Sequence, residues 1–262
     1  MARIVAVANQ KGGVGKTTTT INLAASLAIA EQRVLLVDVD PQGKLTSGVG
    51  QKGKAAAAGT IYDALTAAAP VSDARPFIIP TGVDNMKLIP ADRNLTGAEI
   101  EMVTFPGREE RLRALVLPLR EQFDYIFIDC PPSLGLLTLN ALVAADAVLI
   151  PLHCEYFALE GLADLVGTMK RVRAALNPTL DIEGVLLTMF DERTNLGQQV
   201  ATDVRGFFKE RVFRTVIPRN VRLGEAPSHG MPVILYDVKS RGAEAYLALA
   251  REVLARSTMT AA

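Results

Sequence analysis

The chain has 262 residues, of which 49% are hydrophobic and 21% charged, so it is too apolar to be disordered and large enough for a substantial core. Its 28 basic and 28 acidic residues give a formal net charge of zero, which argues against a protein that coats nucleic acid by bulk charge. Cys130 and Cys154 lack the number and spacing of a disulfide framework, a zinc site or an iron–sulfur cluster, which fits a reducing cytoplasm.

The order of predicted elements points to one fold class. Continuous apolar runs, typical of strands buried on both faces, lie at residues 4–8, 34–37, 86–89, 125–128, 148–152, 184–189 and 215–217. Helix-like segments lie at 16–30, 108–122, 159–176, 198–211 and 242–255. Strands that alternate with helices predict a single-domain, doubly wound α/β fold with a mostly parallel sheet and helices on both faces.

Some segments carry weaker signals. Residues 43–82 are rich in Ala, Gly and Pro and show no strong period, so we expect a surface excursion there. Residues 257–262 are expected to be a frayed tail, which leaves 1–262 as one domain. No apolar run reaches the roughly 20 residues of a membrane span, and the first strand begins too early for a signal peptide to precede it.

The strongest motif is Lys-Gly-Gly-Val-Gly-Lys-Thr-Thr at residues 11–18, between the first predicted strand and the first predicted helix. The glycines let backbone N–H groups converge, and the helix adds its positive N-terminal end, so this loop predicts an oligophosphate site. We expect Lys16 to reach the β- and γ-phosphates and the Thr17 hydroxyl to bind Mg²⁺, with Thr18 a candidate for the α-phosphate. Lys11 is an additional cation at the loop entrance.

Two later strands end in carboxylates. Asp38 and Asp40 follow the strand at 34–37, and Asp129 follows the strand at 125–128. Because the carboxyl ends of parallel strands gather at one edge, we expect the three side chains to surround the phosphate loop. Asp129 would hold Mg²⁺ through water, and Asp40 would orient a water against the γ-phosphate. The alternative for Asp40 is a turn-initiating residue before a proline.

These motifs resemble a known family. Residues 11–18, 38–43 (Asp-Val-Asp-Pro-Gln-Gly) and 129–132 (Asp-Cys-Pro-Pro) are similar to the deviant Walker A, A′ and B motifs of the ParA/MinD family of P-loop ATPases. Further segments resemble its chromosomal ParA branch, Soj, and lie at 155–161, 193–197, 218–223 and 225–228. The resemblance extends from residue 3 to about residue 240 and implies a Mg²⁺-dependent ATPase that binds and hydrolyses ATP.

The resemblance also implies a switch for chromosome or plasmid partitioning. An ATP-bound sandwich homodimer would bind double-stranded DNA without sequence preference, and a ParB-type partner would stimulate hydrolysis and release. The catalytic residues would be Lys11, which crosses to the partner subunit's phosphates, Lys16 and Asp40. The nucleotide would be bound by Lys11, Gly12, Gly13, Val14, Gly15, Lys16, Thr17, Thr18, Pro218 and Asn220, the last two beside the adenine.

A local basic region fits DNA binding by an otherwise neutral chain. Residues 193–241 include nine basic and four acidic residues, which leaves five positive charges. Arg193 and Arg222 match family positions implicated in DNA contact, the alternative being that they only solvate surface helices. We therefore expect a cytoplasmic, nucleoid-associated protein.

Four alternatives are considered, of which an iron–sulfur reductase or cluster scaffold would need cluster cysteines that Cys130 and Cys154 do not supply. A MinD-like division regulator would need a C-terminal amphipathic anchor, which residues 257–262 do not provide. A metabolic enzyme that shares the deviant loop would transfer phosphate to a small molecule and ignore DNA. A ParA-like ATPase that positions another cargo would keep the same nucleotide site. The chain also departs from the Soj pattern at Lys44, which stands where Asn is usual and adds a cation near the switch.

Overall fold

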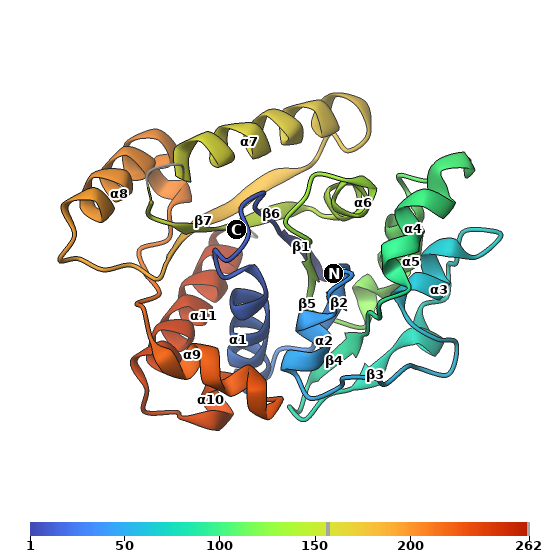
Figure 1. The fold of residues 1–262 in the computed structure, drawn as a ribbon, viewed down its shortest axis with the longest axis horizontal. Helices are drawn as coiled ribbons and strands as arrows, with labels where there is room; N and C mark the ends of the chain where they lie inside the picture. Colours follow the sequence, from blue (N-terminus) through green and yellow to red (C-terminus); the bar gives the residue numbers. More distant parts are fainter. Residues whose placement is uncertain (156–157, 261–262) are drawn as a thin grey trace.

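The structure, a computed structural model, describes residues 1–155 and 158–260. Its centre is a seven-stranded sheet in the order β3-β4-β2-β5-β1-β6-β7 (Figure 1). The strands are β1 (Arg3–Val7), β2 (Val34–Asp38), β3 (Ile79–Pro80), β4 (Met86–Ile89), β5 (Tyr125–Asp129), β6 (Ala147–His153) and β7 (Asp181–Thr188). All pairings between these strands are parallel except that of the short edge strand β3 with β4, which confirms the predicted α/β fold.

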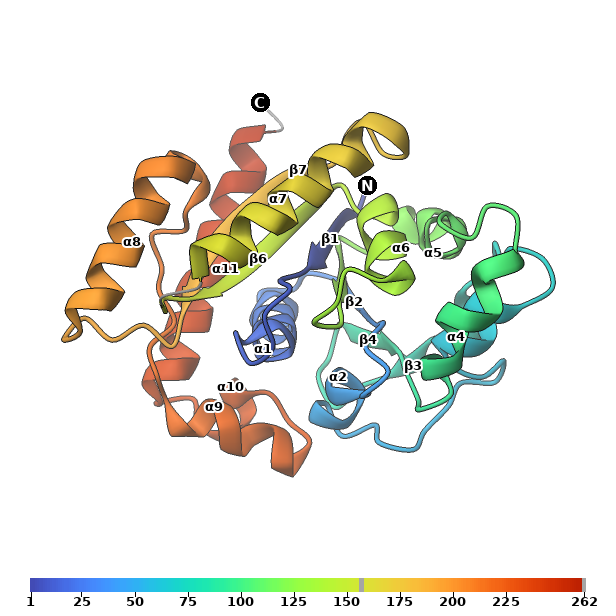
Figure 2. The same cartoon turned by 45° about the horizontal axis from the view of Figure 1, so that its top comes forward.

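Helices cover both faces of the sheet, and each face has its own core. Along β1, Val5 and Val7 pack on one side while Ile4 and Ala6 pack on the other. The first side is covered by α1 (Lys16–Ile29), α2 (Lys44–Gly48), α10 (Val233–Tyr236) and α11 (Arg241–Thr260). The second is covered by α3 (Ile61–Thr66), α4 (Leu95–Glu101), α5 (Arg111–Val116), α6 (Leu136–Ala144), α7 (Ala158–Ala175) and α8 (Asn195–Phe208). Figure 2 shows α7 lying along β6 and β7, with α8 beside it.

Several predicted elements differ from the observed ones. The segment 43–82 is no open excursion, because α2 and α3 bury Leu45 and Ile61 within the two cores. The predicted helix at 108–122 is shorter: α5 gives way after Val116 to a 3₁₀ turn, Leu117–Glu121, that contains a proline. In the tail predicted to fray from residue 257, α11 extends to Thr260, and residues 261–262 lie outside the described part of the chain.

Residues 215–217 do not form the predicted strand. The carboxylate of Glu252 on α11 accepts the backbone N–H groups of Arg214 at 2.8 Å and Thr215 at 2.9 Å. These donors are therefore not available to a strand ladder. The segment instead approaches β7 through two isolated bridges, Val185 with Val212 and Phe190 with Pro218.

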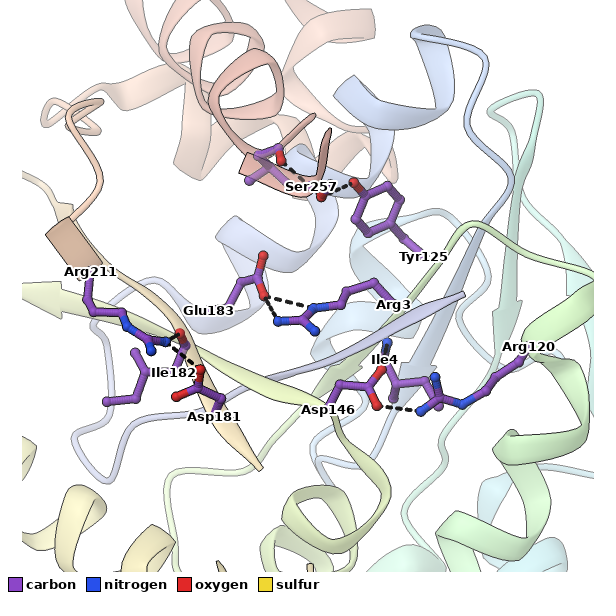
Figure 3. A network of polar contacts seen from close by, with 11 residues as sticks. Arg3, Ile4, Arg120, Tyr125, Asp146, Asp181, Ile182, Glu183, Arg211 and Ser257 are labelled. Atoms are coloured by element: carbon purple, nitrogen blue, oxygen red, sulfur yellow. Dashed lines mark hydrogen bonds and ion pairs between the residues drawn. The ribbon is translucent and has the colours of Figure 1, made fainter. Parts of the chain in front are cut away.

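Polar contacts tie together the amino ends of the strands (Figure 3). Arg3 on β1 pairs with Glu183 on β7 at 2.8 Å, and Asp146 accepts the backbone N–H of Ile4 at 2.9 Å. The Tyr125 and Ser257 hydroxyls lie 2.9 Å apart, which joins the end of α11 to β5. This edge is closed by contacts within the subunit, and the carboxyl ends of the strands form the opposite edge. Among the described residues, no helix combines the length and apolar character needed to cross a membrane.

Candidate active site

The loop between β1 and α1 is shaped by its glycines. Gly13 has φ +76° and Gly15 has φ +88°, both in the left-handed region that side chains rarely adopt. Residues 12–13 form a turn, and no described residue accepts a hydrogen bond of regular geometry from the backbone N–H groups of residues 12–15. The loop is held from behind, because the Thr188 hydroxyl at the end of β7 donates to the carbonyl of Val14 at 2.7 Å. A rigid loop with such N–H groups at a helix N-terminus fits an oligophosphate.

Lys16, the first residue of α1, is only 7% exposed. Its Nζ donates to the carbonyl of Lys11 at 3.1 Å, so the side chain folds back along the loop. Burial lowers the pKa of Lys16, while the nearby charges of Asp129 and Asp40 act in the opposite direction. Lys44, the departure from the family pattern, adds to the lowering by charge repulsion. Lys16 is therefore poorly solvated and well placed to gain from an anionic ligand.

The three carboxylates meet at this edge of the sheet as predicted. β2 and β5 are neighbours, and Asp38 stands opposite Asp129 in the register. The carboxylate of Asp129 accepts hydrogen bonds from the hydroxyls of Thr17 at 2.8 Å and Thr20 at 2.9 Å. Burial, and then the charge of Asp38, raises the pKa of Asp129 to about 8. Burial also raises the pKa of Asp38 to about 6, although Thr46 donates two hydrogen bonds to it.

The hydroxyl of Thr17 and the carboxylate of Asp129 provide hard oxygen donors directly below the phosphate loop. Mg²⁺ binds oxygen, keeps several waters and commonly uses one or two protein groups together with substrate phosphates. The donor set therefore fits Mg²⁺ held jointly with a nucleotide. Within the described residues, no group of three or more His, Cys, Asp or Glu side chains could hold a metal ion by itself.

Asp40 has the turn-initiating role that was the alternative considered for it, and its role toward a water stays a prediction. Its backbone carbonyl accepts the N–H of Gly43 at 2.8 Å and its Oδ1 accepts the N–H of Gln42 at 2.9 Å, so it does initiate a turn. The residue is 6% exposed and lies close enough to Lys16 to influence its pKa. The turn fixes the carboxylate beside the phosphate loop, which leaves its second oxygen able to bind water.

Lys11 contacts its own subunit. Its Nζ forms an ion pair with Glu155, whose other carboxylate oxygen lies 2.8 Å from Nδ1 of His153. The bond from Lys11 lowers the pKa of Glu155, and burial lowers that of His153. Glu155 begins the family-like segment 155–161, of which residues 156–157 lie outside the described part of the chain.

The remaining nucleotide-site candidates lie on different elements. Pro218 forms an isolated bridge with Phe190. Phe190 lies two residues after Thr188, which contacts the phosphate loop. The Asn220 side chain accepts the backbone N–H of Arg222 at 2.9 Å and so caps α9 (Val221–Glu225). Thr18 is half-buried in the first turn of α1. The assignments of the adenine and the α-phosphate to these residues stay predictions.

The two arginines predicted to contact DNA are exposed, and both are paired with carboxylates. The side chain of Arg193 is 89% exposed and pairs with Asp191 at 2.7 Å. Arg222 on α9 pairs with Glu225 at 2.7 Å and with Asp237 at 3.3 Å. Each arginine is accessible to a ligand that could replace its carboxylate.

Four residues of the site were not identified from the sequence. Asn9 accepts the N–H of Lys11 at 3.0 Å and donates to the carbonyl of Pro151 at 2.8 Å, which fixes the entrance of the loop. Thr20 binds Asp129, Thr188 binds the loop at Val14, and Glu155 binds Lys11. An amide directly after a buried strand is a recognisable turn signal for Asn9. Thr188 and Glu155 are distant in sequence from the loop, and Thr20 lies one helical turn after Lys16. The sequence around these three residues gives no sign of a role at the site.

Comparisons with known proteins agree with this geometry. A family model described as an AAA domain matches residues 2–182. The chain is 57% identical to the chromosome partitioning protein ParA of Myxococcus xanthus, over 98% of this chain and 90% of that protein. It is also 57% identical to the sporulation initiation inhibitor protein Soj of Bacillus subtilis, over 97% of this chain and 99% of that protein. A solved structure of cobyrinic acid a,c-diamide synthase from Mycobacterium smegmatis, with ADP and magnesium, has TM-score 0.82 and 38% identity, covering 97% and 94% of the two chains.

Proposed function

The chain belongs to the ParA/Soj branch of the ParA/MinD-type P-loop ATPases, and from that premise we propose that it is the ATP-dependent switch of a chromosome-partitioning system. The observation that carries the proposal is the phosphate loop, whose N–H groups have no regular partner among the described residues and which lies beside Lys16 and the carboxylates at the ends of β2 and β5. This arrangement occurs in a chain whose similarity to ParA and Soj covers almost its whole length.

Each residue at the site has a defined task in ATP hydrolysis. The N–H groups of residues 12–15 and the Lys16 ammonium hold the phosphates. When Lys16 leaves the carbonyl of Lys11, the N–H that it donated there becomes available to the phosphates as well. Thr17 would hold Mg²⁺ directly and Asp129 would hold it through water, and the metal would supply positive charge beside the nucleotide phosphates. Asp40 orients the attacking water through the carboxylate oxygen that is free of the turn.

We further propose that two ATP-bound subunits pair through their phosphate loops. Lys11 would leave Glu155 and bind the partner's phosphates, exchanging one carboxylate for a more highly charged anion. Gly12 would lie where the loops meet. Pairing brings two basic C-terminal regions together, so ATP gates nonspecific binding to DNA by raising the number of phosphate contacts. A ParB-type partner would stimulate hydrolysis and so release the protein from the nucleoid.

A DNA-binding titration tests the proposal. A nonspecific duplex is titrated with protein in ATP, in ADP and without nucleotide, each at two salt concentrations. Binding that requires ATP and weakens steeply with salt is the expected result, with roughly 0.9 unit of slope per phosphate neutralised. Equal DNA affinity in all three nucleotide states, or none, contradicts the switch and favours a metabolic or membrane-associated relative.

A further inference from the structure

The arginines predicted to bind DNA are already bound to anions of their own subunit. Nε and Nη2 of Arg193 donate to the two oxygens of Asp191 at 2.9 and 2.7 Å. This two-bond fork is the geometry in which guanidinium binds a phosphate group. Asp191 is held in place because it also accepts the backbone N–H of Arg193 at 3.0 Å.

Arg222 is also neutralised within its own subunit, but by two carboxylates instead of one. Its Nη1 donates to Glu225 at 2.7 Å, and its Nε lies 3.3 Å from Asp237. The Tyr236 hydroxyl donates to the same oxygen of Glu225 at 3.3 Å, which steadies the carboxylate. Two carboxylates on one guanidinium leave little positive potential for an approaching polyanion.

This pairing is selective within the basic region. Six of its nine cations have no carboxylate within 4.0 Å among the residues that the structure describes: Arg205, Lys209, Arg214, Arg219, Lys239 and Arg241. A third paired cation, Arg211, binds Asp181 at the amino edge of the sheet, away from the phosphate loop (Figure 3). Near the carboxyl edge, pairing therefore coincides with the two arginines that the family resemblance assigns to DNA.

We propose that Asp191 and the Glu225–Asp237 pair stand in for DNA phosphates and lower the DNA affinity of the single subunit, an inference that rests on the proposed function. The pairs are exposed and in water, so each is weak enough to be exchanged for a phosphate. One subunit, with two arginines to release, gains little from DNA. A dimer presents four such arginines on one duplex, so the exchange becomes favourable only after pairing.

The test removes the competing charge and keeps the shape. Asp191→Asn and Glu225→Gln each leave an oxygen that can accept the existing backbone or tyrosine hydrogen bond. DNA affinity is measured for each variant and for the double variant, in ADP and in ATP, over several salt concentrations. We expect about threefold to tenfold tighter binding per carboxylate removed, largest in ADP, with a salt slope steeper by up to about one unit each.

The chain offers a matched control. Asp73 and Arg75 form the same two-residue motif, with both side-chain bonds at 2.8 Å and a backbone N–H bond at 3.1 Å, outside the basic region. Asp73→Asn therefore reports the effect of losing one negative charge anywhere on the surface. Thermal unfolding of all variants checks that the fold is retained.

The outcomes separate this inference from the function on which it rests. If the wild-type protein fails to bind DNA in ATP, both fall. If it binds but Asp191→Asn and Glu225→Gln shift the affinity no more than Asp73→Asn, the masking inference alone is wrong. A gain in the ADP state that exceeds that of Asp73→Asn, together with a steeper salt slope, supports it.

Discussion

Charge balance around the phosphate loop determines what its individual residues can do. Lys16 is the buried cation, and Asp38, Asp40 and Asp129 are three carboxylates at adjacent strand ends. Without a ligand, the crowding is relieved by proton uptake, since burial and its neighbours raise the pKa of Asp129 to about 8. A bound cation would favour the ionised form of the same group. The site is thus arranged for an anion and a cation together.

Replacement of Lys16 should severely weaken nucleotide binding. Lys16→Ala removes the one buried ammonium that faces the loop, and we expect ATP affinity to fall by roughly a hundredfold because a charge-assisted bond to phosphate is lost. Titration with a fluorescent ATP analogue measures this. Lys44→Ala, which removes an exposed nearby cation, should retain nucleotide binding. Wild-type affinity in Lys16→Ala would show that the loop does not bind phosphate through this residue.

Asp40 should affect hydrolysis more than binding. Asp40→Ala loses both the turn bond to Gln42 and the charge, and we expect turnover to fall about a hundredfold or more while ATP is still bound. The protein should then persist on DNA in ATP. Asp40→Asn separates the roles, because the amide oxygen can keep the turn while the charge is lost. Measured phosphate release at the wild-type rate in Asp40→Asn would limit this residue to a structural role.

Among the elements, β7 illustrates how tightly the sheet is packed. Gly184 follows the register shift between Val148 and Leu149, and its Cα faces the ring of Phe213. A Cβ at this position would lie 2.8 Å from Cζ of the ring, which is closer than van der Waals contact allows. The glycine therefore permits the close approach of the 212–217 segment to β7.

Gly184→Ala should destabilise the fold by about 1–3 kcal/mol, because the Phe213 ring must move within a filled core. Urea unfolding followed by circular dichroism measures the change. Gly206→Ala in the exposed part of α8 is the control: a Cβ there meets nothing within 4 Å, and we expect a gain of up to about 1 kcal/mol. An unchanged free energy of unfolding in Gly184→Ala would mean that β7 and the Phe213 ring can move apart with little loss of stability.

The buried strands could be predicted from the sequence because each is a continuous apolar run, as in β1, β2 and β5. The short helices α2 and α3 could not be, because single side chains such as Leu45 fix them to the core. A local signal did exist for α3, since Thr60 and Asp63 form a capping box. The three strand-end carboxylates were predictable from parallel topology alone. The Lys11–Glu155 pair was not, because it joins the loop to the region beyond β6.

At the scale of the whole molecule, the two edges of the sheet have opposite characters. The amino edge is closed by ion pairs within the subunit, such as Arg3 with Glu183 (Figure 3). At the carboxyl edge, the loop N–H groups have no regular partner among the described residues, and Lys11 and Arg222 hold carboxylates that we propose to be exchangeable. Contacts that can be exchanged for a ligand or a second subunit thus lie on one side, which favours assembly through the carboxyl edge.

The proposed assembly through this edge predicts that Gly12 is critical to the dimer and dispensable to the subunit. A Cβ at Gly12 meets nothing within 4 Å in the single chain, and its backbone lies outside the left-handed region, so Gly12→Val should fold normally. If two loops meet there, the added side chain prevents their close approach. In an Asp40→Ala background, which keeps ATP intact, sedimentation velocity with Mg-ATP should show a dimer that Gly12→Val converts to monomer. Gly82→Val, equally unobstructed but remote in sequence on an exposed loop, should leave the dimer unchanged. Dimers of equal stability in Gly12→Val would place the interface elsewhere.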